Sequence, residues 1–297
     1  MKQKRLSNRI LALALAAAML LSATACSSRS ASSEDDSSAS SSTSKDGGIP
    51  AFINMLPEVD LSAIAAPEKP SATLLEKING AIAQNSDVVG WLQIPDTQID
   101  NEVLHYTDND YYLRRDITKD YNWYGCYYAD YENTFGDRNG MSQNTIIYGH
   151  SMDENPEGMK FGQLKKYLDI DFLQNHPYIY FSTPDDQMTW QIFSVMYTDN
   201  GFKYIHPSFP NRDTKMTITD VVNEMKDRSV FDINTEVNAD DKILCLSTCT
   251  YVFGAYQSPQ YEQSRFVICA RLVRPGEQLN PTLTATVNAD AKQPTFK

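Results

Sequence analysis

The spacing of apolar residues predicts one early helix and then a change of character. Between residues 71 and 85, Leu74, Ile78 and Ile82 recur with the spacing of one helix face, and Ser71 can cap the first turn. After this segment the apolar residues fall into short runs bounded by turn residues, as in β-strands. These runs are 91–94, 102–105, 125–128, 145–148, 179–181, 190–197, 243–247 and 265–273.

Two helical segments, 159–167 and 218–228, interrupt the strand-like runs. Many short strands with few helices predict a mainly β domain, either a closed barrel or a sandwich. We interpret the tyrosine-rich segment 121–131 as part of the packing of this domain.

The N-terminus has the three-part layout of a secretory signal. Basic residues within 2–9 precede the apolar run 10–21, and small residues lead to Cys26. The ending resembles a bacterial lipobox, in which the cysteine is lipidated, although Ala23 stands where Leu is usual. Three alternatives stay open: a lipoprotein signal with lipidation at Cys26, an uncleaved signal anchor, or simple secretion. All three place the rest of the chain outside the cytoplasm.

The distribution of residue types along the chain predicts four segments. Residues 1–25 form the signal peptide or signal anchor, and residues 26–70 form a Ser-rich flexible tether, with eleven Ser between 27 and 44. Residues 71–275 form the folded domain, and residues 276–297 form a polar C-terminal tail without clear periodicity.

Charge excludes some function classes. The chain has 297 residues, with 26 Lys and Arg against 38 Asp and Glu, a formal net charge of −12. This balance argues against nucleic-acid binding, which normally needs a basic patch. After the N-terminus, no apolar stretch of about 20 residues could make this a multi-pass membrane protein.

Cys249 stands apart from the other cysteines. Cys126, Cys245 and Cys269 lie in apolar runs, and we expect them to be buried small hydrophobic residues. Cys249 follows the run 243–247, where a strand meets a loop, so its thiol can be held by the sheet and still be open to a reactant. It is therefore the candidate nucleophile.

A nucleophilic cysteine needs a partner that favours the thiolate, normally a histidine. His150 follows the run 145–148, at another junction between a strand and a loop. His150 is therefore the candidate base, and the alternative is a hydrogen-bonded structural histidine.

Three motifs then resemble sortases, especially those of class B. Residues 144–152 (NTIIYGHSM) resemble the histidine motif, and residues 246–249 (LSTC) resemble the L-x-T-C active-site strand. Residues 264–267 (SRFV), followed by 270–273 (ARLV), resemble the strand that carries the essential arginine. Smaller class B matches occur at 89–95, 108–113, 161–164 and 176–177. The resemblance spans about residues 87–273.

This resemblance implies a fold and a chemistry. The fold is a closed eight-stranded β-barrel with an N-terminal helical extension and a helix in the loop before the catalytic strand. The activity is that of a cysteine transpeptidase, which cleaves a C-terminal sorting signal of secreted proteins after Thr through a thioester. Cys249 would be the nucleophile, His150 the acid and base, and Arg265 the donor to the oxyanion.

The resemblance extends less firmly to substrate recognition. Ser247, Thr248 and Ser264 are expected to line the groove beside the nucleophile. Arg271 competes with Arg265 for the arginine role, because both would share one face of a regular strand. An insert at 251–263 separates Cys249 from Arg265 and could reshape the groove. We expect no metal site and no cofactor.

The expected partners are sorting-signal peptides, an amine on peptidoglycan or its lipid-linked precursor, and the membrane through the N-terminal anchor or lipid. The expected location is the extracellular face of the bacterial cell membrane. Two other functions stay open: a non-catalytic surface lipoprotein with a sortase-like barrel, and a purely hydrolytic cysteine peptidase.

Overall fold

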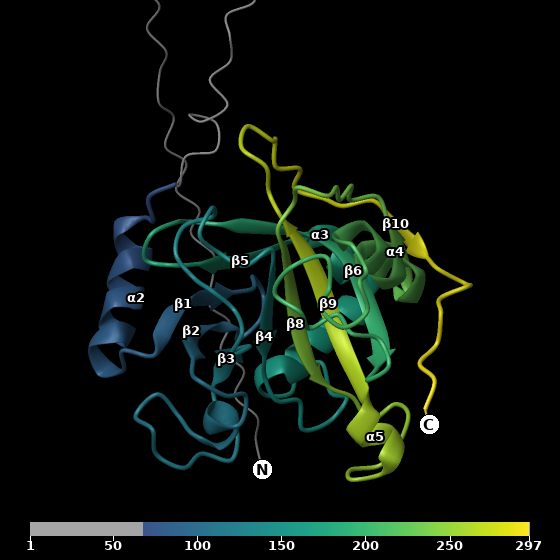
Figure 1. The fold of residues 1–297 in the computed structure, drawn as a ribbon, viewed down its shortest axis with the longest axis horizontal. Helices are drawn as coiled ribbons and strands as arrows, with labels where there is room; N and C mark the ends of the chain where they lie inside the picture. The colour runs from purple at the N-terminus through teal and green to yellow at the C-terminus, as the bar shows by residue number, and fades with distance from the viewer. Residues whose placement is uncertain (1–67, 297) are drawn as a thin grey trace, which may run out of the picture. The chain divides into compact units, whose positions relative to one another are not determined.

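A closed barrel of eight strands dominates residues 68–296, the part of the chain that the computed structural model describes (Figure 1). The strands follow one another around the barrel in the order β1-β2-β3-β4-β8-β9-β6-β5. This confirms the predicted eight-stranded barrel. Its strands are β1 (Val88–Gln93), β2 (Asp100–His105), β3 (Tyr127–Ala129), β4 (Asn144–Tyr148), β5 (Tyr178–Ser182), β6 (Thr189–Asp199), β8 (Ile243–Cys249) and β9 (Ser264–Leu272).

The directions of three neighbouring strands bring distant parts of the chain to one edge of the barrel. β4 and β8 are parallel, with Tyr148 opposite Ser247, so both strands end at the same edge. β9 is antiparallel to β8, with Arg265 opposite Cys249, so β9 begins where β8 ends. In Figure 1 this is the edge beside α5 (Pro259–Gln263), the short helix between β8 and β9.

The residues of β8 explain its continuous apolar run. Leu244 and Leu246 pack into the barrel interior with Trp190 and Phe266. Ile243 and Cys245 face the other side, where they join the cluster under α4 (Ile218–Arg228). A strand that is buried on both faces reads as a run of apolar residues instead of an alternating pattern.

Helices cover the barrel and its edges. α2 (Ala72–Gln84) starts at Ser71, whose side chain accepts a hydrogen bond from the Leu74 N–H, and α4 starts with a capping box formed by Thr217 and Asp220. The segment expected to be helical at 159–167 is a 3₁₀ helix, η3 (Lys160–Leu168), and α3 (Ile170–Asn175) follows it. A second 3₁₀ turn, η2 (Tyr111–Arg114), lies between β2 and β3.

The segment after Pro275 contains structure that its polar composition did not predict. β10 (Ala285–Val287) pairs with β7 (Phe231–Ile233) in a separate two-stranded sheet. Leu283 and Ala285 are buried in the main hydrophobic core. The end of the chain is therefore packed onto the barrel domain.

The predictions for the signal segment 1–25, for Cys26 and for the tether up to residue 67 lie outside the described residues. Within residues 68–296, no helix is both long enough and apolar enough to cross a membrane.

Candidate active site

The three residues singled out for chemistry lie on adjacent strands at the shared edge of the barrel. Cys249 is the last residue of β8, and Arg265, opposite it, is the second residue of β9. His150 follows β4 by two residues, and β4 lies on the other side of β8. The fold thus brings together one thiol, one imidazole and one guanidinium from three distant motifs.

Burial separates Cys249 from the other cysteines of the described chain. Cys126, Cys245 and Cys269 are buried, as predicted, whereas Cys249 is half-buried. Burial raises the pKa of the Cys126 thiol to about 12 and also raises that of Cys269, so both stay neutral and unreactive. Among the described cysteines, Cys249 is the one that a reactant can reach.

An ion pair between a buried lysine and a half-buried glutamate fixes the backbone beside Cys249. The Glu154 carboxylate accepts hydrogen bonds from Thr250 Oγ1 at 2.8 Å and from the Tyr251 N–H at 2.6 Å. It also pairs with Lys165 Nζ at 2.9 Å, and Lys165 donates to the Cys249 carbonyl at 3.4 Å. Burial lowers the pKa of Lys165, and Glu154 opposes this effect. We call Glu154 and Lys165 the carbonyl clamp.

Tyr261, in α5, lies against the thiol from the insert side. Its hydroxyl is hydrogen-bonded to Cys249 and Tyr251, and its pKa is raised by burial and then by Cys249. The 251–263 insert therefore reaches the candidate nucleophile through this buried side chain.

His150 is half-buried and is held through its Nε2 atom. This nitrogen lies 2.8 Å from the Leu113 carbonyl oxygen and 2.7 Å from Arg114 Nη1. The pKa of His150 is lowered, first by burial and also by Arg114 and Lys160, while the Leu113 carbonyl opposes the change. At neutral pH the imidazole is therefore mainly uncharged.

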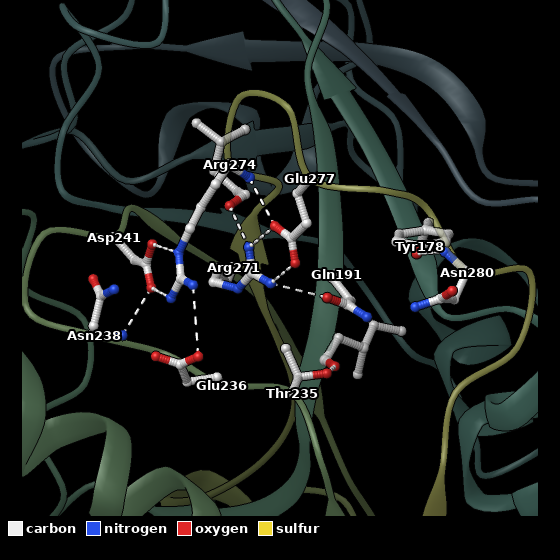
Figure 2. A network of polar contacts seen from close by, with 12 residues as sticks. Tyr178, Gln191, Thr235, Glu236, Asn238, Asp241, Arg271, Arg274, Glu277 and Asn280 are labelled. Atoms are coloured by element: carbon white, nitrogen blue, oxygen red, sulfur yellow. Dashed lines mark hydrogen bonds and ion pairs between the residues drawn. The ribbon is translucent and has the colours of Figure 1, made fainter. Parts of the chain in front are cut away.

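The two candidate arginines of β9 have different environments. Arg265 is half-buried, and its Nη1 donates to two backbone carbonyls, those of Ser264 at 2.7 Å and Glu262 at 3.1 Å. Arg271 is buried and forms a bidentate pair with Glu277, with a further bond to Gln191 (Figure 2). Arg271 therefore forms a structural ion pair. Arg265 instead lies opposite Cys249 in the β8–β9 pair.

Comparison with known proteins agrees with this geometry. The family model described as the sortase domain matches residues 92–273, more than half of the chain. The chain belongs to the sortase family. It is similar to sortase B of Listeria monocytogenes, with 38% identity over 64% of this chain and 71% of the relative. It is also similar to sortase B of Staphylococcus aureus, with 29% identity over 69% of this chain and 76% of the relative.

Solved sortase structures match the fold as well. A Staphylococcus aureus sortase B-substrate complex matches with a TM-score of 0.56 and 26% identity, covering 66% of this chain and 84% of that one. A sortase B complexed with triglycine matches with a TM-score of 0.55 and 28% identity, covering 66% of this chain and 85% of that one. This sortase is thus a cysteine transpeptidase of the sortase B type.

The side chains expected to line the groove of this sortase are buried, and each forms a hydrogen bond to another residue of the chain. The Ser247 hydroxyl bonds to that of Tyr204 at 2.7 Å, and Thr248 Oγ1 donates to the Gly149 carbonyl at 2.7 Å. Ser264 Oγ donates to the Thr250 carbonyl at 3.4 Å. These bonds tie β8 and the residue after it to neighbouring segments at the site. Substrate contact by the three residues stays a prediction.

Several residues of the site were missed by sequence reasoning. Glu154 and Lys165 lie in a loop and a 3₁₀ helix without a motif that indicates chemistry, and Arg114 lies in a charged stretch typical of a solvated surface. The one available signal was the class B match at 108–113, which ends beside Arg114. Within residues 68–296, no group of three His, Cys, Asp or Glu side chains is arranged to hold a metal ion.

Proposed function

We propose that this sortase cleaves the sorting signal of secreted proteins after Thr and transfers the protein to an amine of peptidoglycan or of its lipid-linked precursor. The observation that carries the proposal is the half-buried Cys249 level with Arg265, at the barrel edge that His150 shares. A binding module would have no need for this combination of groups.

In the first step, neutral His150 takes the proton of the Cys249 thiol, and the resulting thiolate attacks the Thr carbonyl carbon to form a tetrahedral intermediate. Arg265 donates hydrogen bonds to the oxyanion, a task for which its planar, permanently charged guanidinium is suited. The C–N bond then breaks, His150 gives a proton to the leaving amine, and a thioester remains on Cys249.

In the second step, an acceptor amine attacks the thioester carbonyl. His150, neutral again, takes a proton from this amine, the C–S bond breaks, and the proton passes from His150 to the Cys249 sulfur, which restores the thiol. The product is a new amide bond between the Thr carbonyl and the acceptor. Hydrolysis would follow the same path with water in place of the amine.

The relatives support the two partner classes. Solved sortase B structures include one described as a substrate complex and one complexed with triglycine, a peptide with a free amine. Family membership also supports a place at the cell surface. We propose that the segment 1–25 or a lipid on Cys26 attaches the chain there. Ser247, Thr248 and Ser264 would then act at the substrate groove, by direct contact or by holding β8 and β9 in place.

The test uses the purified full chain and fluorogenic peptides of the N-P-x-T-x and x-P-x-T-G types, beside a Cys249→Ala control. We expect cleavage after Thr that is abolished in the control, as measured by mass spectrometry of the products. Addition of triglycine or a diaminopimelate peptide should replace the hydrolysis product with an amide.

Two results would contradict the proposal. Cleavage that produces only hydrolysis at every amine concentration would favour a peptidase. No cleavage of any peptide, together with slow alkylation of Cys249, would favour a binding protein with an occluded groove.

A further inference from the structure

The two neighbours of His150 Nε2 make opposite demands on that atom. The Leu113 carbonyl at 2.8 Å can only accept a hydrogen bond, whereas Arg114 Nη1 at 2.7 Å can only donate one. Nε2 carries either a proton or a lone pair. It can therefore satisfy Leu113 or Arg114, but not both at the same time.

Each choice corresponds to a different state of the ring. When Nε2 accepts from Arg114, the neutral imidazole carries its proton on Nδ1. When Nε2–H donates to the Leu113 carbonyl, Nδ1 is either a free base or, in the imidazolium, a second donor. Because Nε2 is engaged by residues 113 and 114, Nδ1 is the nitrogen left to exchange protons with the sulfur and the amines.

Arg114 is itself held in place from a second side. Its Nη1 also donates to the Trp123 carbonyl at 2.6 Å, and its guanidinium lies 4.2 Å from the centre of the Trp123 ring. The Trp123 side chain is 48% exposed, although we interpreted its segment as barrel packing. A hydrogen bond and a cation–π contact together hold the guanidinium against the imidazole.

The two positive charges near His150 both lower its pKa. The cations that face it are Arg114, from η2, and Lys160, at the start of η3. On the β8 side of the β4–β8 pair, the titratable group at the same edge is the Cys249 thiol. Both cations disfavour the imidazolium, but only Arg114 is in hydrogen-bond contact with the ring.

We propose that Arg114 is a positioning residue for the transpeptidation reaction, because it holds His150 as the neutral tautomer with its proton on Nδ1. This inference rests on the proposed function. Arg114 orients the resting imidazole through Nε2. Nδ1 becomes a base only after Nε2–H has turned to the Leu113 carbonyl. When the ring becomes a base or an imidazolium, Nε2 changes its partner from Arg114 to the Leu113 carbonyl, so the ring keeps a hydrogen bond in every state.

The experiment compares three variants of the full chain. Arg114→Gln keeps a polar side chain but removes the charge, and Arg114→Lys keeps the charge but removes the planar fork. The matched control is Arg115→Gln, because Arg115 is the next residue and stacks on Tyr111 at 4.3 Å in the same way. The His150 imidazole is titrated by NMR, and its signal is assigned by its loss in His150→Gln. The pH profile of peptide cleavage is measured on the same variants.

We expect Arg114→Gln to raise the pKa of His150 and to move the acidic limb of the pH profile to higher pH. Its kcat should fall on the order of tenfold or more, because the ring loses an orienting partner, while KM stays nearly constant. Arg114→Lys should keep the pKa close to that of the parent chain. Arg115→Gln should change neither the titration nor the profile.

An active Arg114→Gln variant with unchanged titration and unchanged pH profile would overturn the proposal. The same holds if Arg115→Gln shifts the titration as much as Arg114→Gln does. If the parent chain cleaves none of the peptides, the proposed function fails, and the titration alone still decides whether Arg114 controls the protonation of His150.

Discussion

At the scale of single residues, the carbonyl clamp shows how a buried charge can organise a site. Lys165 has a side chain that is only 1% exposed, and Glu154 is its salt-bridge partner. In Glu154→Gln, this buried ammonium loses its counter-ion, and Thr250 and Tyr251 lose a charged acceptor. We expect a loss of about 2 kcal/mol in the free energy of unfolding, measured by urea denaturation, since Glu154 is partly solvated.

The chain offers a matched control for this prediction. Glu157 pairs with Lys166 at 2.5 Å, three positions after Glu154 and one after Lys165, but its side chain is 69% exposed. Glu157→Gln should therefore cost less than about 0.5 kcal/mol. Equal costs for the two variants would show that the buried pair adds nothing beyond a surface salt bridge.

The predictability of the site also differs residue by residue. Cys249 and His150 could be found because each follows an apolar run that is recognisable as a strand, where a polar side chain is held at an edge. Arg265 was found by resemblance alone, since Arg271 fits the strand equally well by spacing. Arg114 could not be found, because its contact with His150 depends on how a loop folds over the barrel edge.

At the scale of elements, β9 carries one arginine for chemistry and one for stability. Arg265→Lys should lower kcat/KM on the order of 100-fold, because Lys lacks the planar fork that binds an oxyanion, while the melting temperature stays unchanged. Arg271→Gln should instead lower the free energy of unfolding by about 2 kcal/mol, because it breaks the bidentate pair with Glu277.

Peptide cleavage and thermal unfolding, measured on both variants, separate the two roles. The assignment is wrong if Arg271→Gln remains fully folded and inactive while Arg265→Lys turns over normally.

The C-terminal segment gives a second prediction at this scale. Leu283 is 6% exposed and packs in the main core beside β10. Leu283→Ala should lower the free energy of unfolding by about 2–3 kcal/mol, through lost burial and a residual cavity. Leu279→Ala is the control, because Leu279 is 51% exposed, and its effect should stay within about 0.5 kcal/mol. Similar melting temperatures for both variants would contradict the packing described for this segment.

β10 was missed because its three residues carry little pattern. Of these, Ala285 is buried and the other two are exposed, so neither composition nor alternation distinguishes the strand from a polar tail. η3 was expected to be an ordinary helix, since its apolar residues have helical spacing and periodicity alone does not separate the tighter 3₁₀ form.

At the scale of the whole molecule, acid should unfold the chain through its carboxylates. Burial opposes ionisation of Asp199, but bonds from Thr295, Gly201 and Arg228 lower its pKa. The pKa is also lowered for Asp87, Asp100, Asp116, Asp213, Asp220, Glu224 and Glu277. A carboxylate with a depressed folded pKa stabilises the fold above its unfolded pKa of about 4, and this stability is lost as the pH falls through the folded pKa.

We therefore expect the urea midpoint to decrease between about pH 5 and about pH 2. Protonation also relieves the repulsion within a chain of net charge −12, which acts in the opposite direction. Asp199→Asn should lower the urea midpoint at neutral pH. It should also make the decrease of this midpoint between about pH 5 and about pH 2 smaller. A midpoint that rises steadily as the pH falls would mean that relief of repulsion outweighs the paired carboxylates.

The barrel as a whole was predictable only in part. Its strands follow from short apolar runs, and β8 in particular follows from being buried on both faces. The strand order does not follow from periodicity, because the pairing of β4 with β8 joins segments that no local pattern connects. Here the resemblance to sortases supplied the closed barrel.

The parallel pair of β4 and β8 also has a consequence for the time at which the enzyme becomes active. Thr248 bonds to Gly149 across a sequence separation of 99 residues. Such non-local contacts are slow to form, since the entropy of a long loop must be lost before they stabilise the chain. Until β8 pairs with β4, Cys249 lacks His150 at its edge of the barrel, so a partly folded chain carries a thiol without its acid–base partner. Closure of the barrel then completes the active site, so transpeptidase activity can begin only after this pairing has formed.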